Sequence, residues 1–122
     1  MSSIQKEDRP GRFSVRPAVV DGVLIVTVHG EIDRNVKDAL GQALALGDGM
    51  TPPLRIVADL SGVTFMDSSG INVFITAHLR VSQAQGWLRI AGAQESVLRV
   101  LQMVGVDTVI PCHLTVEQAL NA

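Results

Sequence analysis

The sequence predicts a single α/β domain with a mixed, mostly parallel sheet. Apolar, β-branched runs typical of buried strands alternate with stretches in which apolar residues recur at helical spacing. The resulting order is ββαβαβαβα, and such alternation implies parallel strands joined by right-handed crossovers. The 122 residues suffice for one domain with a buried core, and the pattern contains no internal repeat or linker.

The first half of the chain is expected to supply a hairpin and one helix. An edge strand over residues 13–16 and a central strand over residues 23–29 are joined by a hairpin turn at Asp21-Gly22. A turn over residues 30–33 leads to a helix whose apolar face consists of Val36, Ala39, Leu40, Ala43 and Leu44. Pro17 is expected to stop the edge strand, because proline cannot donate to a ladder. Asp33 is the expected N-cap of the helix.

The second half is expected to alternate three strands with three helices. A buried strand over residues 54–60 is followed by a loop over 65–70 and by a helix that ends at Gly86 and carries Ile71, Phe74, Ile75 and Leu79. A strand over residues 87–91 comes next, and after residues 94–96 a helix with Val97, Val100, Leu101 and Val104. A brief strand over residues 109–110 and a terminal helix complete the chain. Gly105 suits a helix C-cap. Thr115 and Gln118 have capping-box spacing, so they open the terminal helix.

The loop over residues 65–70 is the most informative stretch of the sequence. Asp67, Ser68 and Ser69 are all residue types that cap helix N-termini, and they stand where a strand gives way to a helix. Free backbone N–H groups and the positive end of a helix favour an anion at such a place. The anion is expected to be a ligand, or a phosphate group attached to one of the serines.

Residues 59–71 read DLSGVTFMDSSGI, which resembles the signature D-L-S-x-V-x-F-M-D-S-S-G-[LI] of the anti-sigma factor antagonists, the stand-alone bacterial STAS-domain proteins. Residues 30–33, 101–106 and 117–120 resemble three further segments of that family. The resemblance implies a STAS domain over residues 13–122, with the helices largely on one face of the sheet. Residues 1–12 are polar, with Pro10 and Gly11, and are expected to form a flexible tail.

The resemblance also implies a regulatory function without catalysis. The unphosphorylated protein would bind an anti-sigma factor of the serine kinase type, which frees the sigma factor. The kinase would then phosphorylate Ser68, with Ser69 as the second choice, and a phosphatase would reset the switch. The expected partner-binding residues are Asp33, Asp67, Ser68, Ser69, Gly70 and Val73. Val73 lies off the apolar stripe of its helix, so it is either ordinary core or part of an exposed docking surface.

Several other interpretations fit single features of the sequence. Both serines suit plain helix caps, and Asp33 and Asp67 suit caps or a carboxylate pair. A serine hydrolase would need the G-x-S-x-G elbow, but Phe65 or Met66 stands where the first glycine belongs. Nothing in the sequence places His29, His78 or His113 beside Ser68. A nucleotide- or small-ligand-sensing STAS module, or a subunit of a larger sensory assembly, is the alternative function.

Composition narrows the range of partners. The formal net charge of −2 gives no basic face for nucleic acid, and no apolar run approaches the length of a membrane span. The single cysteine, Cys112, excludes an internal disulfide and is expected to be a small apolar filler. We therefore expect a cytoplasmic monomer or weak dimer that uses no cofactor and no metal.

Overall fold

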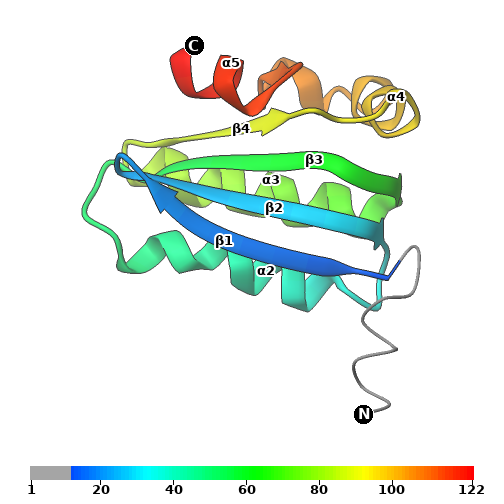
Figure 1. The fold of residues 1–122 in the computed structure, drawn as a ribbon, viewed down its shortest axis with the longest axis horizontal. Helices are drawn as coiled ribbons and strands as arrows, with labels where there is room; N and C mark the ends of the chain where they lie inside the picture. Colours follow the sequence, from blue (N-terminus) through cyan, green and yellow to red (C-terminus); the bar gives the residue numbers. More distant parts are fainter. Residues whose placement is uncertain (1–11) are drawn as a thin grey trace.

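The sheet has five strands in the spatial order β1-β2-β3-β4-β5 (Figure 1). In this computed structural model, which describes residues 12–122, β1 (Ser14–Val20) pairs antiparallel with β2 (Val23–Ile32). The remaining strands add in parallel, and they are β3 (Arg55–Met66), β4 (Trp87–Ala91) and β5 (Cys112–His113). The expected mixed, mostly parallel sheet is confirmed. The flexible tail expected over residues 1–12 lies, apart from Arg12, outside the described residues.

The hairpin follows the sequence signal at its turn but not in the length of its first strand. Asp21 and Gly22 both have positive φ, 51° and 80°, as a type I′ turn requires. The prediction that Pro17 stops the edge strand is wrong, because β1 continues to Val20 and Pro17 pairs with Val26. β1 lies at the edge of the sheet, so the N–H that proline lacks is not needed by a further strand.

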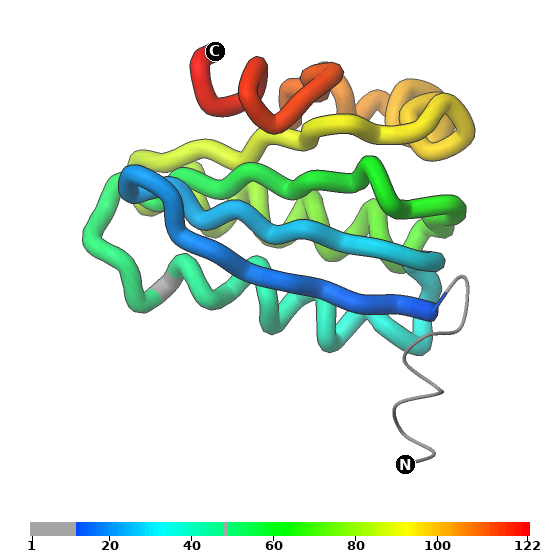
Figure 2. Tube along the Cα trace, in the orientation of Figure 1, coloured from blue at the N-terminus to red at the C-terminus, as the bar shows by residue number. Residues whose placement is uncertain are grey.

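The helices divide unequally between the two faces of the sheet. They are α2 (Lys37–Ala45), α3 (Ser68–Gln83), α4 (Glu95–Met103) and α5 (Val116–Asn121), with short 3₁₀ helices η1 (Leu46–Gly49) and η2 (Val106–Thr108). Figures 1 and 2 show α3 running behind the sheet with α2 beside it. Ile56 packs in the core with α2, α3 and α4, whereas the next residue, Val57, packs against Ala119 of α5. Because successive strand residues point to opposite faces, only α5 covers the second face.

The apolar face of α3 differs from the expected one. Ile71 and Phe74 are buried as predicted, but Ile75 and Leu79 are 37% and 57% exposed. Ala77 and Val81 are buried in their place. The prediction was based on the larger apolar residues, whereas the side of α3 that packs on the sheet carries the small Ala77. Two apolar side chains of α3 therefore face solvent.

The chain after α4 contains the second correction to the predicted elements. Gly105 has a φ of 78° and caps α4 as expected, and Val97 and Leu101 are buried. The strand expected over residues 109–110 is wrong, because β5 forms after Pro111, over Cys112–His113. Pro111 still takes part in the sheet through its carbonyl, which accepts a hydrogen bond from Ile90 N at 2.9 Å.

Two further helix ends show how local chemistry sets the boundaries. The Thr115 side chain accepts from Gln118 N at 3.1 Å, so the expected cap of α5 is confirmed. At the end of α3 the left-handed residue is Gln85, with φ 61°, and Gly86 N donates to Val81 O at 2.8 Å. Gly86 is required there for space, since a Cβ would overlap the backbone of Leu54.

Candidate functional site

The site is built where β2 and β3 end side by side. Ile32 and Met66 are paired in register as the last residues of their strands. The next residues along each strand, Asp33 and Asp67, therefore lie at the same edge of the sheet. The long loop expected over residues 65–70 is wrong, because β3 runs to Met66 and α3 begins at Ser68. Asp67 alone connects β3 to α3.

Asp67 is the N-cap of α3, which decides among the three candidate capping residues. Its side chain accepts a hydrogen bond from Ser69 N at 2.8 Å, and its backbone is extended. Its carbonyl accepts from Gly70 N and Ile71 N at 3.1 and 3.3 Å. Asp67 thus follows the end of β3 and caps α3, and its carboxylate is the capping group.

The two serines that follow have different surroundings. Ser68 is the first residue of α3 and is exposed. Ser69 is half-buried, and its side of the helix lines a groove described below. A kinase must reach the hydroxyl that it phosphorylates, and Ser68 is more exposed than Ser69. Ser68 also stands at the positive end of a helix sixteen residues long, where added negative charge is favoured.

Gly70 is buried, and packing explains why a glycine stands there. A Cβ at this position would lie 2.7 Å from Ile32 Cγ2 and 2.7 Å from Met66 Cγ. The first turn of α3 therefore sits directly on the ends of β2 and β3. Gly70 thus allows α3 to pack closely against the ends of β2 and β3, and it offers a partner no side chain to contact.

Asp33 has a role different from the helix cap that the sequence predicts. α2 begins at Lys37, and its N-cap residue, Val36, makes no side-chain capping bond. Asp33 instead closes a turn before the helix, with its Oδ1 accepting from Asn35 N at 2.9 Å. Aspartate side chains form hydrogen bonds within turns as well as at helix caps, and Asp33 forms the turn bond. The bond is local and exposed, and it uses one of the two carboxylate oxygens of Asp33.

The region of β2 before Asp33 also departs from expectation. Residues 30–32 were predicted to turn the chain, yet they remain in β2. Gly30 adopts a φ of 95°, and the register with β3 shifts between Gly30 and Glu31. Bulges of this kind redirect a strand without ending it.

A groove runs between α2 and α3, and Ser69 lies in its lining. It has a volume of about 540 Å³, and its lining residues are Lys37, Asp38, Gly41, Gln42, Leu44, Ala45, Ser69, Asn72, Val73, Thr76, Ala77 and Arg80. Val73 is half-buried, packs against the core and also lines the groove, and its role in docking stays a prediction. The sequence analysis missed the polar rim. Its signal was available, because Ser69, Thr76 and Arg80 recur at helical spacing on one side of α3.

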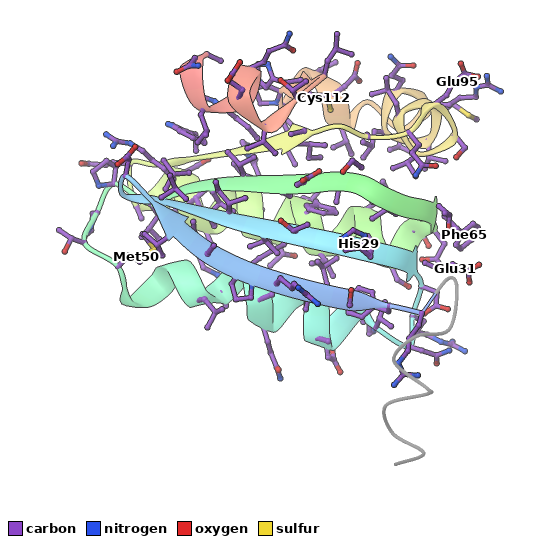
Figure 3. The ribbon with its side chains drawn as sticks, viewed as in Figure 1. His29, Glu31, Met50, Phe65, Glu95 and Cys112 are labelled. Carbon is purple, nitrogen blue, oxygen red and sulfur yellow. The ribbon has the colours of Figure 1, made fainter. Side chains whose placement is uncertain are left out.

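An exposed aromatic side chain lies at the same edge as the two aspartates. Phe65 is 47% exposed and is paired with Glu31 on β2. Figure 3 shows both side chains at the strand ends, where β3 meets α3. The sequence placed Phe65 in a loop and gave no reason to single it out. Its exposure adds apolar surface beside the carboxylates of Asp33 and Asp67.

The histidines do not assemble a catalytic group with the serines. Within residues 12–122, neither Ser68 nor Ser69 shares a hydrogen bond with a histidine side chain. His29 lies over Gly62 of β3, on the sheet itself. Buried nitrogens of His78 and His113, Nδ1 and Nε2 respectively, have no hydrogen-bond partner.

Cys112 is partly buried, and its surroundings affect the reactivity of its thiol. Burial raises the pKa of the Cys112 thiol to about 11, and the charge of Asp107 adds to the rise. A thiol that stays protonated at neutral pH is a poor nucleophile. In the described part of the chain no three His, Cys, Asp or Glu residues gather as metal ligands would, and no helix is long and apolar enough to cross a membrane.

Comparison with known proteins places this architecture in a family. Residues 14–119 match the STAS domain, and the chain belongs to the STAS domain family. Its relatives include the anti-sigma F factor antagonist of Paenibacillus polymyxa, 29% identical over 100 residues that cover 82% of this chain and 86% of the relative. The anti-sigma-B factor antagonist of Listeria monocytogenes is 34% identical over 100 residues, covering 79% and 82% of the two chains.

The solved structures agree with the sequence relatives. An anti-sigma factor antagonist from Mycobacterium paratuberculosis superposes with a TM-score of 0.81 at 30% identity, covering 93% of this chain and 95% of that one. The expected resemblance and the expected STAS fold are thereby confirmed.

Proposed function

We propose that this chain is an anti-sigma factor antagonist that works by partner switching. In its unphosphorylated form it binds an anti-sigma factor, and the sigma factor held by that protein is released. The names of its relatives support this function. The structural observation that carries the switch is the exposed Ser68, fixed as the first residue of α3 by the Asp67 cap.

The anti-sigma factor docks on the strand ends and the mouth of the groove between α2 and α3. Phe65 and Val73 supply apolar contact, and Asp33 supplies a carboxylate for a basic residue of the partner. An apolar centre with charged groups at its rim is the usual composition of a specific interface. Ser68 lies within this surface, so a group added to it meets the partner directly.

Phosphorylation of Ser68 by the bound kinase ends the interaction. The phosphoryl group carries about −1.5 to −2 charges at neutral pH, and it brings this charge beside the carboxylate of Asp67. Pressing such a group against an apolar or acidic partner surface requires desolvation or meets repulsion. The antagonist itself catalyses nothing. It acts in the cytoplasm, where a separate phosphatase removes the phosphate and restores binding.

The proposal is tested with the anti-sigma factor and sigma factor from the same cells. The purified antagonist is added to their complex without ATP, and released sigma factor is measured by size-exclusion chromatography. ATP is then added, and the modified residue is mapped by mass spectrometry in wild type, Ser68→Ala and Ser69→Ala. Ser69→Ala is the matched control, because it removes the neighbouring hydroxyl from the same helix turn.

We expect release of sigma factor before ATP, one phosphate on Ser68, and loss of antagonist binding afterwards. Ser69→Ala should be phosphorylated on Ser68 as wild type is, while Ser68→Ala should release sigma factor in the presence of ATP as well. Sigma factor that stays bound in all conditions contradicts the antagonist function. Phosphate that persists in Ser68→Ala overturns the residue assignment alone.

A further inference from the structure

A second pocket lies at the opposite end of the sheet from Ser68. Its volume is about 480 Å³, and it is lined by Val20, Asp21, Val23, Arg55, Trp87, Arg89, Leu120, Asn121 and Ala122. Val23, Arg55 and Trp87 are the first residues of β2, β3 and β4. These strands run parallel and the phosphorylation surface stands at their far ends, so the two regions are separate.

Arg89 is held in a fixed position inside this pocket. Its guanidinium lies 3.6 Å from the centre of the Trp87 ring, and its NH1 donates to the carbonyl of Ala119 at 2.8 Å. Partial burial lowers the pKa of Arg89 from its ordinary value. Stacking and the bond to a backbone carbonyl already restrict the conformations of this side chain. Its remaining N–H groups can therefore bind a further acceptor at a small additional loss of conformational entropy.

Arg55 brings a second positive charge to the same face. It is paired with Trp87, and Arg89 is paired with Val57, so the two arginines are diagonal neighbours on adjacent strands. Because alternate residues of a strand share a face, both side chains stand on the same face of the sheet. Among the side chains that the structure describes, which leave out residues 1–11 and Asp48, neither arginine forms an ion pair with a carboxylate. Guanidinium groups that form no ion pair keep N–H groups with which they can bind the oxygens of an anion.

The remaining walls define what kind of anion fits. Val20, Val23 and Leu120 make part of the lining apolar, and the volume lies in the range of small-molecule sites. Two carboxylates also line the pocket, the side chain of Asp21 and, in this chain, the terminal group of Ala122, and they offset part of the positive charge of Arg55 and Arg89. A pocket whose positive charge is partly offset suits a monoanion better than a dianion.

We propose that this pocket binds a small organic oxyanion, a carboxylate attached to an apolar or aromatic group. The two guanidinium groups hold the carboxylate, and the apolar lining receives the body of the ligand. The lining of this pocket shares no residue with the groove between α2 and α3.

The experiment uses the indole N–H signal of Trp87 in a two-dimensional NMR spectrum. Trp87 is the only tryptophan of the sequence, so the signal reports on this pocket alone. The probes are benzoate, phenyl phosphate and the neutral benzyl alcohol. They are titrated into wild type, Arg55→Gln and Arg16→Gln. Arg16 is the matched control, an exposed arginine of the edge strand outside the pocket.

We expect benzoate to shift the Trp87 signal saturably, with one site per chain, and Arg55→Gln to weaken that binding about tenfold or more, the effect of losing one charged contact. Arg16→Gln should bind benzoate as wild type does, and benzyl alcohol should bind more weakly. Tighter binding of phenyl phosphate than of benzoate would replace the carboxylate by a phosphate as the preferred group.

Two outcomes would overturn the proposal. One is the absence of any saturable shift with both anions. The other is a benzoate affinity that Arg55→Gln leaves unchanged, or that Arg16→Gln lowers by the same factor, since either shows that the signal reports general charge and not this pocket. The amide spectra of the variants establish that the fold is intact in each case.

Discussion

The backbone N–H of Asp67 donates to the carbonyl of Ile32 at 3.1 Å, across the ends of β3 and β2. This bond extends the ladder by one step beyond the Ile32–Met66 pair. It joins the residue that caps α3 to the residue before Asp33. A change that moves the start of α3 must therefore move the position of Asp33 as well.

Gly70→Ala is expected to destabilise the fold by about 1–3 kcal/mol, the usual effect of forcing an extra group into a packed site. The added methyl would stand 2.7 Å from Ile32 Cγ2, and Ile32 is fully buried with no room to yield. Urea unfolding measures the change.

Gly41→Ala is the control for the intrinsic helix preference of alanine. Gly41 lies inside α2, and a Cβ there would meet no atom within 4 Å. This variant should gain up to about 1 kcal/mol, because alanine is the better helix former. Similar gains in both variants would show that the contact of Gly70 with the strand ends is unimportant.

Asp67→Ala should lower the free energy of unfolding by about 0.5–2 kcal/mol, because it removes the acceptor for Ser69 N. Asp67→Asn keeps an oxygen in that place and should lose much less. The comparison of urea midpoints separates the cap from the charge. Equal losses in the two variants would mean that the negative charge, not the hydrogen bond, stabilises the start of α3.

Local signals in the sequence predicted one turn and two helix ends correctly. The Asp21-Gly22 hairpin, the Gly105 cap and the Thr115 cap are each determined by one or two residues whose backbone or side chain has few alternatives. The strand over residues 87–91 was also predicted with its correct bounds. These features need no knowledge of the rest of the chain.

The compactness of the site could not be predicted, because it depends on contacts between distant strands. β2 and β3 extend to Ile32 and Met66 by pairing with each other through register shifts. The exposure of Ile75 and Leu79, and the groove beside Val73, depend in the same way on how α3 sits on the sheet and beside α2. A sequence pattern shows which residues are apolar, but it does not show which of them the neighbouring elements cover.

Asp33→Asn should weaken binding of the anti-sigma factor more than it weakens folding. An asparagine oxygen still accepts from Asn35 N, so the local turn persists. If the carboxylate pairs with a basic residue across the interface, its loss costs about 2–5 kcal/mol of binding. Calorimetry with the partner and thermal unfolding of the free protein measure the two effects. Unchanged affinity with a lowered melting temperature would restrict Asp33 to its turn.

Phosphorylation of Ser68 should act by blocking the docking surface, with no change of fold. A phosphate at the start of α3 gains about 0.3–1 kcal/mol from the helix dipole. The neighbouring Asp67 carboxylate opposes that gain, so the net effect on stability should be near zero. At the interface the same group must be desolvated or repelled, and each ~1.4 kcal/mol lowers affinity tenfold. Ser68→Asp carries only one charge, so it should weaken binding less than phosphate does.

Backbone amide NMR of the two forms distinguishes blocking from refolding. Shifts confined to residues 67–73 and the adjoining end of β2 are expected, because Asp67 joins only these segments. The signals of β4 and α5 should stay in place, since α5 packs on the opposite face of the sheet and β4 is separated from β2 by β3. Shifts spread through β4 and α5 on phosphorylation would mean that the domain itself rearranges. A Ser68→Asp variant that binds the partner as tightly as wild type would count against an electrostatic switch.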